Sequence, residues 1–271
     1  MMGLLEIFSH AFMLRAFIVG VLISVVAAII GVSLVLRKQS MLGDGLSHVA
    51  FGAFALATVL GFTPLWFSLP VVIFVSFLIL HLNQNSKLSG DASIALLSAS
   101  SLAIGTLAIS ISKGVNIDLN SYLFGSILSV GWSDVVLSTI LAILSILLYI
   151  FAHNRIFALT FDAEFARSIG INTRLYDAFF AIICSFVVVL GMRLLGALLI
   201  SSLLIFPATI SLGFSKSFKT IVLLSAFVSI FAFLIGLLLS YFFSLPTGAT
   251  VVLVNLFVFV VAKILDFLRK V

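Results

Sequence analysis

Long apolar runs, interrupted by short polar or Gly/Pro segments, make up most of the chain. Nine runs can be placed, at 14–36, 46–62, 65–82, 92–112, 135–151, 176–192, 195–214, 220–243 and 247–267. A helix that crosses the hydrocarbon core of a bilayer needs about 20 mostly apolar residues, so each run predicts a spanning helix. Only Arg193 and Leu194 separate the sixth run from the seventh. Because that pair could merge, the pattern predicts eight or nine spans.

The composition supports a membrane protein. Of 271 residues, 63% are hydrophobic and only 8% are charged, and the mean hydropathy is +1.40, whereas soluble chains carry roughly 25% charged residues. We therefore expect an all-α, polytopic membrane protein with one transmembrane domain over residues 1–271. The first run is too long for a signal-peptide core, so no cleavable leader is expected. The single cysteine excludes a disulfide scaffold, a Cys-rich zinc module and an iron–sulfur protein.

The positions of the basic residues predict the orientation. A net charge of +5 would suit nucleic acid, but the basic residues stand between the apolar runs, so no nucleic-acid partner is expected. Cytoplasmic loops are enriched in Lys and Arg. If the N-terminus is outside, the outer segments carry only Arg15, Lys113 and Arg193 of the 14 basic residues. The chain is therefore predicted to be N-out and C-in.

Two connecting segments are long enough to have a function of their own. The outer one covers residues 113–134, and the inner one, residues 153–177, is the most polar stretch of the chain. In the inner segment, Asp162 can cap a short helix over 163–169, and Gly170 is suited to end it. A short amphipathic helix at this position is either an interfacial element or a docking surface for a soluble partner. The residues alone leave both interpretations open.

Sequence motifs for soluble catalysis are missing. The chain contains no GxxxxGK[ST], HExxH, GxSxG or CxxC motif, so it does not bind ATP through a P-loop. An enzyme acting within the membrane would need paired acids, or a serine with a lysine or histidine. The serines of the spans are more simply explained as small polar residues between packed helices. We therefore expect a transport protein and not an enzyme.

The exception is the segment MLGDGLSHVAFGA at 41–53, which contains Asp44 and His48. Residues four apart lie on one face of a helix, and a carboxylate with an imidazole suits Zn²⁺ or Mn²⁺. The alternative is that Asp44 caps the second helix while His48 is an ordinary polar residue of its first turns. Two ligands do not complete a tetrahedral site, but a symmetric dimer would supply four.

The remaining polar residues near the span ends have simpler explanations. His10, His81 and His153 stand at span boundaries, where side chains with polar tips are common. Asp91 and Asp177 stand where helices enter from the inner side, and we expect them to act as caps or dipole partners.

Six motifs in a fixed order carry a resemblance to a known family. They are VLRKQSMLGDGLSH at 35–48, SASSLAIG at 98–105, DLNSYLFGSIL at 118–128, TFDAEFARSIGIN at 160–172, GALLISSLLIFPA at 196–208 and LPTGATVVLVN at 245–255. With these motifs the chain resembles, over nearly its whole length, the membrane permeases of ATP-binding-cassette (ABC) importers for zinc and manganese. The family is distantly related to cobalamin and siderophore importers. The resemblance implies a reduced cobalamin-importer-type (type II) permease fold.

The resemblance also implies roles and partners. It associates Asp44 and His48 with the transported cation, and it makes 161–171 a coupling helix that sits in a groove of a cytoplasmic ATPase. The residues assigned to this coupling are Phe161, Asp162, Glu164, Phe165, Arg167 and Gly170. It implies a homodimer with two ATPase subunits and an extracytoplasmic metal-binding protein. No permanently bound cofactor is expected, because Zn²⁺ or Mn²⁺ would be the substrate, and the location would be the bacterial cytoplasmic membrane.

Two details of the motifs bear on packing and on the metal. Family members usually carry Gly five residues after the histidine, whereas here Gly52 is four residues after His48 and position 53 is Ala. The run GALLISSLLIFPA resembles the zinc branch, and no Pro follows His48. We therefore expect zinc uptake, with manganese or iron import as the alternative. An ion-coupled secondary transporter is a further alternative, but it would usually carry several paired charges or inverted repeats within its spans.

Overall fold

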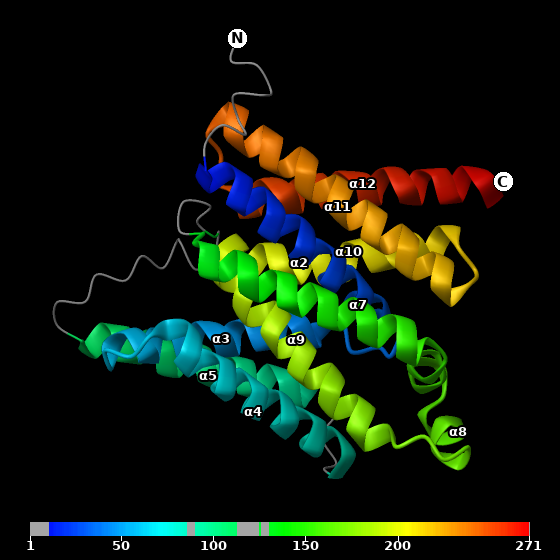
Figure 1. The fold of residues 1–271 in the computed structure, drawn as a ribbon, viewed down its shortest axis with the longest axis horizontal. Coiled ribbons are helices and arrows are strands. Elements are labelled where there is room, and N and C mark those ends of the chain that lie inside the picture. Colours follow the sequence, from blue (N-terminus) through cyan, green and yellow to red (C-terminus); the bar gives the residue numbers. More distant parts are fainter. Residues whose placement is uncertain (1–10, 86–89, 113–124, 126–129, 271) are drawn as a thin grey trace.

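The computed structural model describes residues 11–85, 90–112, 125 and 130–270, and its regular elements in this part are all helices (Figure 1). They are α2 (Ala11–Leu36), α3 (Met41–Val59), α4 (Pro64–Asn85), α5 (Gly90–Ile111), α7 (Trp132–Phe161), α8 (Ala163–Ser168), α9 (Thr173–Leu195), α10 (Ala197–Phe214), α11 (Phe218–Phe243) and α12 (Thr247–Lys270). Within the described ranges, 9 helices are long and apolar enough to cross a membrane. The all-helical prediction is therefore confirmed, and the described helices match the larger of the two predicted span counts, eight or nine.

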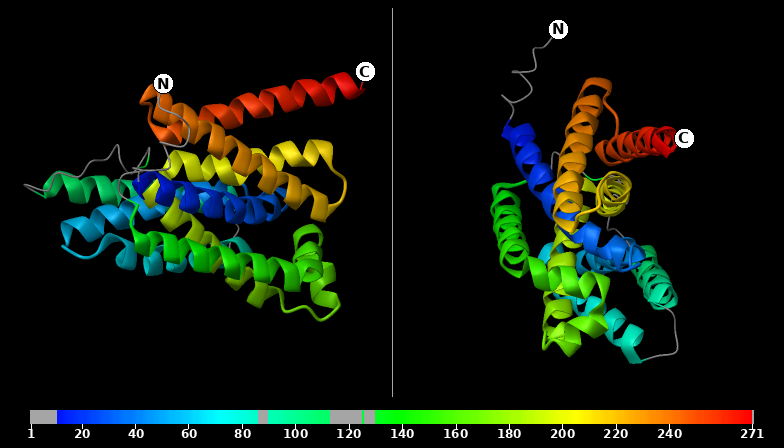
Figure 2. Two further views of the ribbon diagram at one scale, coloured as in Figure 1. Left: turned by 45° about the horizontal axis from the view of Figure 1, so that its top comes forward. Right: turned by 90° about the vertical axis from the view of Figure 1, so that its right-hand side faces the viewer.

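Helix α2 forms the centre of the bundle and packs against α7, α9, α10 and α11. Small residues on α2, including Gly20, Ala27, Ala28 and Gly31, are buried, and they let the neighbouring helices approach closely. Buried serines add polar links between helices. Ser229 on α11 donates a hydrogen bond of 3.0 Å to the Ser24 carbonyl oxygen of α2. In the views of Figure 2, α12 lies at the periphery, where it packs on α10 and α11.

Helix α3, which carries Asp44 and His48, packs most extensively against α5 and also against α4, α9 and α10. Gly52 is at the closest approach, since a Cβ atom there would lie 2.3 Å from the Ser101 carbonyl oxygen of α5. A side chain at this position would push the two helices apart. The glycine four residues after His48 therefore supports close packing, although family members usually carry it one residue later.

Two helix boundaries differ most from the sequence prediction. Helix α7 continues past the predicted end at 151 as far as Phe161, so the first part of the polar inner segment is helical. High hydropathy marks only the part of a helix that lies in the apolar zone. The helix itself can continue into the polar boundary, because its backbone hydrogen bonds are made within the helix. Helix α3 starts at Met41 instead of 46, which places Asp44 in its first turn.

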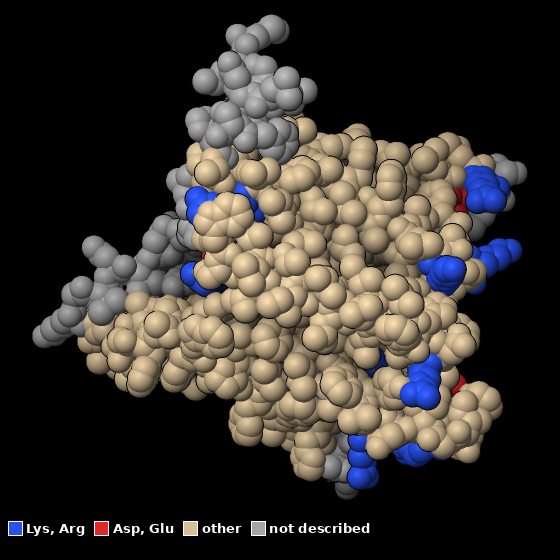
Figure 3. Space-filling view, in the orientation of Figure 1, with Lys and Arg blue, Asp and Glu red and all other residues tan. Residues whose placement is uncertain are grey.

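On the face shown in Figure 3, charged side chains lie at the two ends of the bundle and leave the broad middle uncharged. Lysine and arginine are more numerous at the end that carries α8 and the C-terminal part of α12. Under the positive-inside rule this end is cytoplasmic. The nine candidate spans of the described ranges are an odd number, which agrees with the N-out, C-in prediction.

Candidate metal site and coupling helix

Asp44 and His48 lie together on one face of α3. His48 Nε2 is 3.7 Å from Asp44 Oδ2, and Ser201 Oγ of α10 donates a hydrogen bond of 3.0 Å to Asp44 Oδ1. The two side chains are 41% (Asp44) and 36% (His48) exposed on the single chain. The serine fixes one carboxylate oxygen, so the other oxygen and the imidazole nitrogen are left facing each other at the protomer surface.

The interpretation of Asp44 as a helix cap is wrong. Ser40 occupies the N-cap position of α3, and Asp44 is within the first helical turn. The carboxylate is directed at Ser201 and His48 instead of at the backbone N–H groups of the helix start.

The separation of the two side chains fits a shared cation. Ligand bonds of about 2.1 Å meeting at a tetrahedral angle would put two ligand atoms roughly 3.4 Å apart, close to the 3.7 Å between Oδ2 and Nε2. Over the described residues there is no group of three or more His, Cys, Asp or Glu side chains that could hold a metal. One chain therefore offers two candidate ligands at this position, fewer than a tetrahedral site requires.

The other candidate histidines lie elsewhere. His10 lies outside the described residues, and His81 is exposed near the inner end of α4. His153 packs its ring against Tyr149 and Phe218, with centroid distances of 5.1 and 5.5 Å. Neither described histidine joins the Asp44–His48 pair.

The predicted short helix of the inner segment is present as α8, with the predicted cap. Asp162 Oδ1 accepts hydrogen bonds from the backbone N–H groups of Glu164 and Phe165 at 3.0 and 2.9 Å. Gly170, with a φ of +84°, turns the chain after the helix, a conformation that glycine adopts without steric cost. Local sequence thus determines both ends of α8.

Most of α8 projects from the inner end of the bundle. Ala166 is buried, whereas Glu164 and Arg167 are exposed. Phe161 and Phe165 are also exposed, at 57% and 56%. Exposed aromatic side chains rimmed by charges are typical of a protein docking surface.

Comparison with known proteins identifies the family. The family model described as the ABC 3 transport family matches residues 9–266. The chain belongs to this family. The permease is 32% identical over 267 residues to the manganese transport system membrane protein MntC of Listeria innocua. This match covers 97% of the permease and 93% of MntC. The permease is 29% identical over 247 residues to the high-affinity zinc uptake system membrane protein ZnuB of Haemophilus influenzae, covering 91% and 95%.

A solved structure agrees with this assignment. PsaBC from Streptococcus pneumoniae in complex with Fab superposes with a TM-score of 0.83 at 26% identity, covering 96% of the permease and 95% of that chain. The permease is thus a multi-pass membrane subunit of a zinc/manganese ABC importer, a transport component and not an enzyme. Family membership also decides against the secondary transporter and the intramembrane enzyme.

Two ion pairs of the permease were not predicted from its sequence. Arg37 Nη1 lies 2.8 Å from Asp177 Oδ1, so Asp177 is an ion-pair partner and not a helix cap. Near the outer end, Arg193 Nη1 lies 2.9 Å from Oδ1 of Asp134, whose side chain is only 1% exposed. The paired residues are far apart in sequence, and no local pattern links them.

Proposed function

We propose that the permease imports zinc and that the ion passes between the Asp44 and His48 side chains of two copies of the chain. The observation that carries the proposal is the half-exposed Asp44–His48 pair, with its facing oxygen and nitrogen 3.7 Å apart. The pair supplies two ligands, and a second copy related by a two-fold axis would complete four.

Energetics favours a protein partner at this surface. A carboxylate directed at lipid costs about 2.5–3.5 kcal/mol on insertion scales, so Asp44 is expected to face a cavity or a subunit interface. The neighbouring helix α5 exposes small and weakly polar side chains, namely Ala99, Ser100, Ala103, Thr106 and Ser110. Small residues permit close contact between helices in a bilayer. These features support a homodimer that meets along α3 and α5.

The ends of the bundle suit the two further partners. The exposed α8, with Glu164 and Arg167 flanking Phe165, would dock into a cytoplasmic ATPase. An extracytoplasmic metal-binding protein would deliver the ion at the outer end, near the segment 113–134. Residues 113–124 and 126–129 of that segment lie outside the described residues.

In this mechanism the permease performs no covalent step. Asp44 and His48 replace part of the hydration shell of the incoming ion, while Ser201 keeps the carboxylate oriented. Coordination must be weak enough for release on the inner side. ATP binding and hydrolysis on the partner subunits shift the permease between outward- and inward-open states through α8, and the states must differ in their affinity for the ion.

The choice of zinc rests on ligand chemistry and on the motif at 196–208. One oxygen and one nitrogen from each copy suit either ion, and the general affinity order favours Zn²⁺ over Mn²⁺ at an unbiased site. Manganese import is the second candidate, because a manganese transport protein is 32% identical to the permease.

ATP-driven uptake into vesicles, with zinc and manganese in competition, tests the proposal. We expect zinc uptake that falls by at least about tenfold in Asp44→Asn and in His48→Gln. Asp91→Asn and His81→Gln are matched controls and should transport normally. Uptake of manganese in preference to zinc supports the second candidate, and full uptake by the double variant of Asp44 and His48 contradicts the proposed site.

Association with the ATPase is tested separately. Replacing both Glu164 and Arg167 with alanine should abolish co-purification of the cytoplasmic ATPase, whereas replacing Lys216 and Lys263 should not. If the ATPase remains bound to the first variant, α8 is not the docking element.

A further inference from the structure

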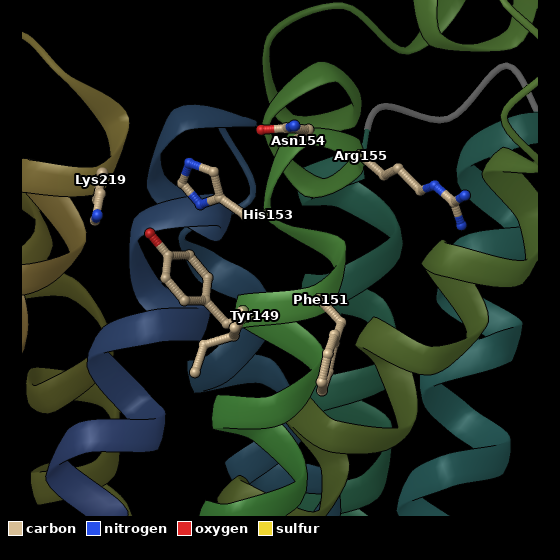
Figure 4. A pocket seen from close by; sticks show the side chains of 7 residues that line it. Tyr149, Phe151, His153, Asn154, Arg155 and Lys219 are labelled. Atoms are coloured by element: carbon tan, nitrogen blue, oxygen red, sulfur yellow. The ribbon is translucent and has the colours of Figure 1, made fainter.

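A polar pocket of about 540 Å³ lies at the inner ends of α7 and α11. Its lining includes Tyr149, His153 and Asn154 from α7 and Lys219 from the first turn of α11. In Figure 4 the side chains of Tyr149 and His153 point toward the side of the pocket where Lys219 lies. Arg155 points away from them and donates a hydrogen bond of 2.7 Å to the Tyr176 hydroxyl. The pocket thus gathers a cation and several hydrogen-bonding groups.

Within the described part of the chain, two of these groups lack a polar partner, one a hydrogen-bond partner and the other an ion-pair partner. The Tyr149 hydroxyl is buried and has no hydrogen-bond partner, although buried polar groups are nearly always paired. Lys219 is exposed and takes part in none of the ion pairs found over the described residues. An anionic ligand with acceptor oxygens would pair directly with Lys219, and a rotation of the Tyr149 side chain toward the pocket would let its hydroxyl donate to the same ligand.

An apolar surface leads away from the pocket along α11. Lys219 is the first of four exposed residues spaced four apart, so they lie along one face of the helix. The next three are Leu223, Phe227 and Phe231, which are 59%, 66% and 47% exposed. The stripe therefore has a cation at its cytoplasmic end and apolar side chains over about 18 Å of helix, roughly the depth of one leaflet.

Helix α7 presents a second stripe of the same kind. Asn154 is exposed at its inner end, and Phe151, Leu147 and Leu144 are 84%, 46% and 54% exposed. Helix α2 packs against both α7 and α11 and lies between them in Figure 1. Phe151, Asn154 and Lys219 all line the pocket, so each stripe starts at its rim.

We propose that this pocket binds the phosphate headgroup of an anionic phospholipid of the inner leaflet, with the acyl chains along the stripes of α7 and α11. Basic pockets between helices on the cytoplasmic side are suited to anionic headgroups. Free phosphate would use the same polar groups but would gain nothing from the apolar stripes. The paired arrangement of pocket and stripes therefore favours a lipid.

A bound lipid would contact the base of the coupling helix. The His153 ring packs on Phe218 at a centroid distance of 5.5 Å, and Phe218 packs on Phe157 at 5.6 Å. Phe157 in turn packs on Phe161 at 4.8 Å, the last residue of α7 before α8. The headgroup would order the cluster from which α8 projects.

Native mass spectrometry of the purified permease tests the proposal directly, with phosphatidylglycerol, phosphatidylcholine and inorganic phosphate as probes. We expect phosphatidylglycerol to be retained over phosphatidylcholine and to resist displacement by millimolar phosphate. Lys219→Glu should lower its retention by about tenfold. Lys263→Glu makes the same charge change at the inner end outside the pocket and should have little effect. Tyr149→Phe removes only the hydroxyl and should lower retention by about threefold.

Three outcomes would overturn the proposal. The first is equal retention of phosphatidylglycerol and phosphatidylcholine. The second is an equal loss of phosphatidylglycerol retention in Lys219→Glu and Lys263→Glu. The third is complete displacement of phosphatidylglycerol by inorganic phosphate. If Lys219→Glu does not fold, Lys219→Gln and Tyr149→Phe carry the same test. Lipid retention is measured without metal or ATP, so its result does not depend on the proposed zinc import.

Discussion

Arg37 Nη1 and Asp177 Oδ1 lie 2.8 Å apart, although the residues are 140 positions apart in the sequence. Arg37 follows α2 and precedes α3, the helix that carries the proposed metal ligands. Asp177 lies near the start of α9, shortly after α8. The side chains are only 15% and 21% exposed, and the Arg37 guanidinium also lies over the Phe180 ring at 5.5 Å. The pair therefore connects the proposed metal helix to the proposed docking segment.

Breaking this pair should affect both stability and coupling. Removing one partner leaves the other charge largely buried, at a cost on the order of 2–4 kcal/mol. We expect Arg37→Ala and Asp177→Asn to unfold at lower temperature and to transport less metal for each ATP hydrolysed. Thermal unfolding in detergent and the transport-to-hydrolysis ratio in proteoliposomes measure the two effects. The charge-exchanged variant, R37D with D177R, should regain part of the transport-to-hydrolysis ratio. If the ratio is unchanged in the single variants, the Arg37–Asp177 pair has no role in coupling.

Gly52 should tolerate no side chain. The added Cβ of Gly52→Ala would meet the Ser101 carbonyl oxygen at 2.3 Å, so α3 and α5 must separate, at a cost of about 1–3 kcal/mol. Gly213→Ala is the matched control, since a Cβ there meets nothing within 4 Å. The midpoint temperature of thermal unfolding should fall for Gly52→Ala and should not fall for Gly213→Ala. Equal stability of the two would show that the α3–α5 contact is looser than described.

The N-cap of α8 should influence ATPase binding. Alanine at position 162 removes both hydrogen bonds to the helix start and costs about 1 kcal/mol of helix stability. A frayed α8 should bind the ATPase about fivefold more weakly, as measured by titration of the purified subunits. Asp162→Asn keeps a capping oxygen and removes the charge, so it should bind nearly normally. If asparagine weakens binding as much as alanine does, the charge and not the cap is responsible.

Local patterns explain how much of the fold could be predicted. Apolar runs of spanning length predict the nine helices, and the Asp162 and Gly170 signals predict both ends of α8, because these features depend on neighbouring residues alone. The start of α3 was placed too late, since Met41–Gly45 is less apolar than the rest of the span. The end of α7 was placed too early for the same reason, as hydropathy reports the membrane zone and not the extent of a helix.

Contacts between distant segments could not be predicted. The spacing of Asp44 and His48 predicts their shared face, but the hydrogen bond from Ser201 depends on how α10 packs against α3. The Arg37–Asp177 pair likewise depends on the arrangement of the whole bundle.

Metal stoichiometry of the purified permease tests the central claim most directly. If two copies of Asp44 and His48 form one site, equilibrium binding of zinc should saturate at about one ion for every two chains. Asp44→Asn and His48→Gln should each remove this binding, while the dimer stays intact by size-exclusion chromatography. Saturation at one ion for each chain, or unchanged binding in the variant that carries both substitutions, would contradict a site shared across the dimer.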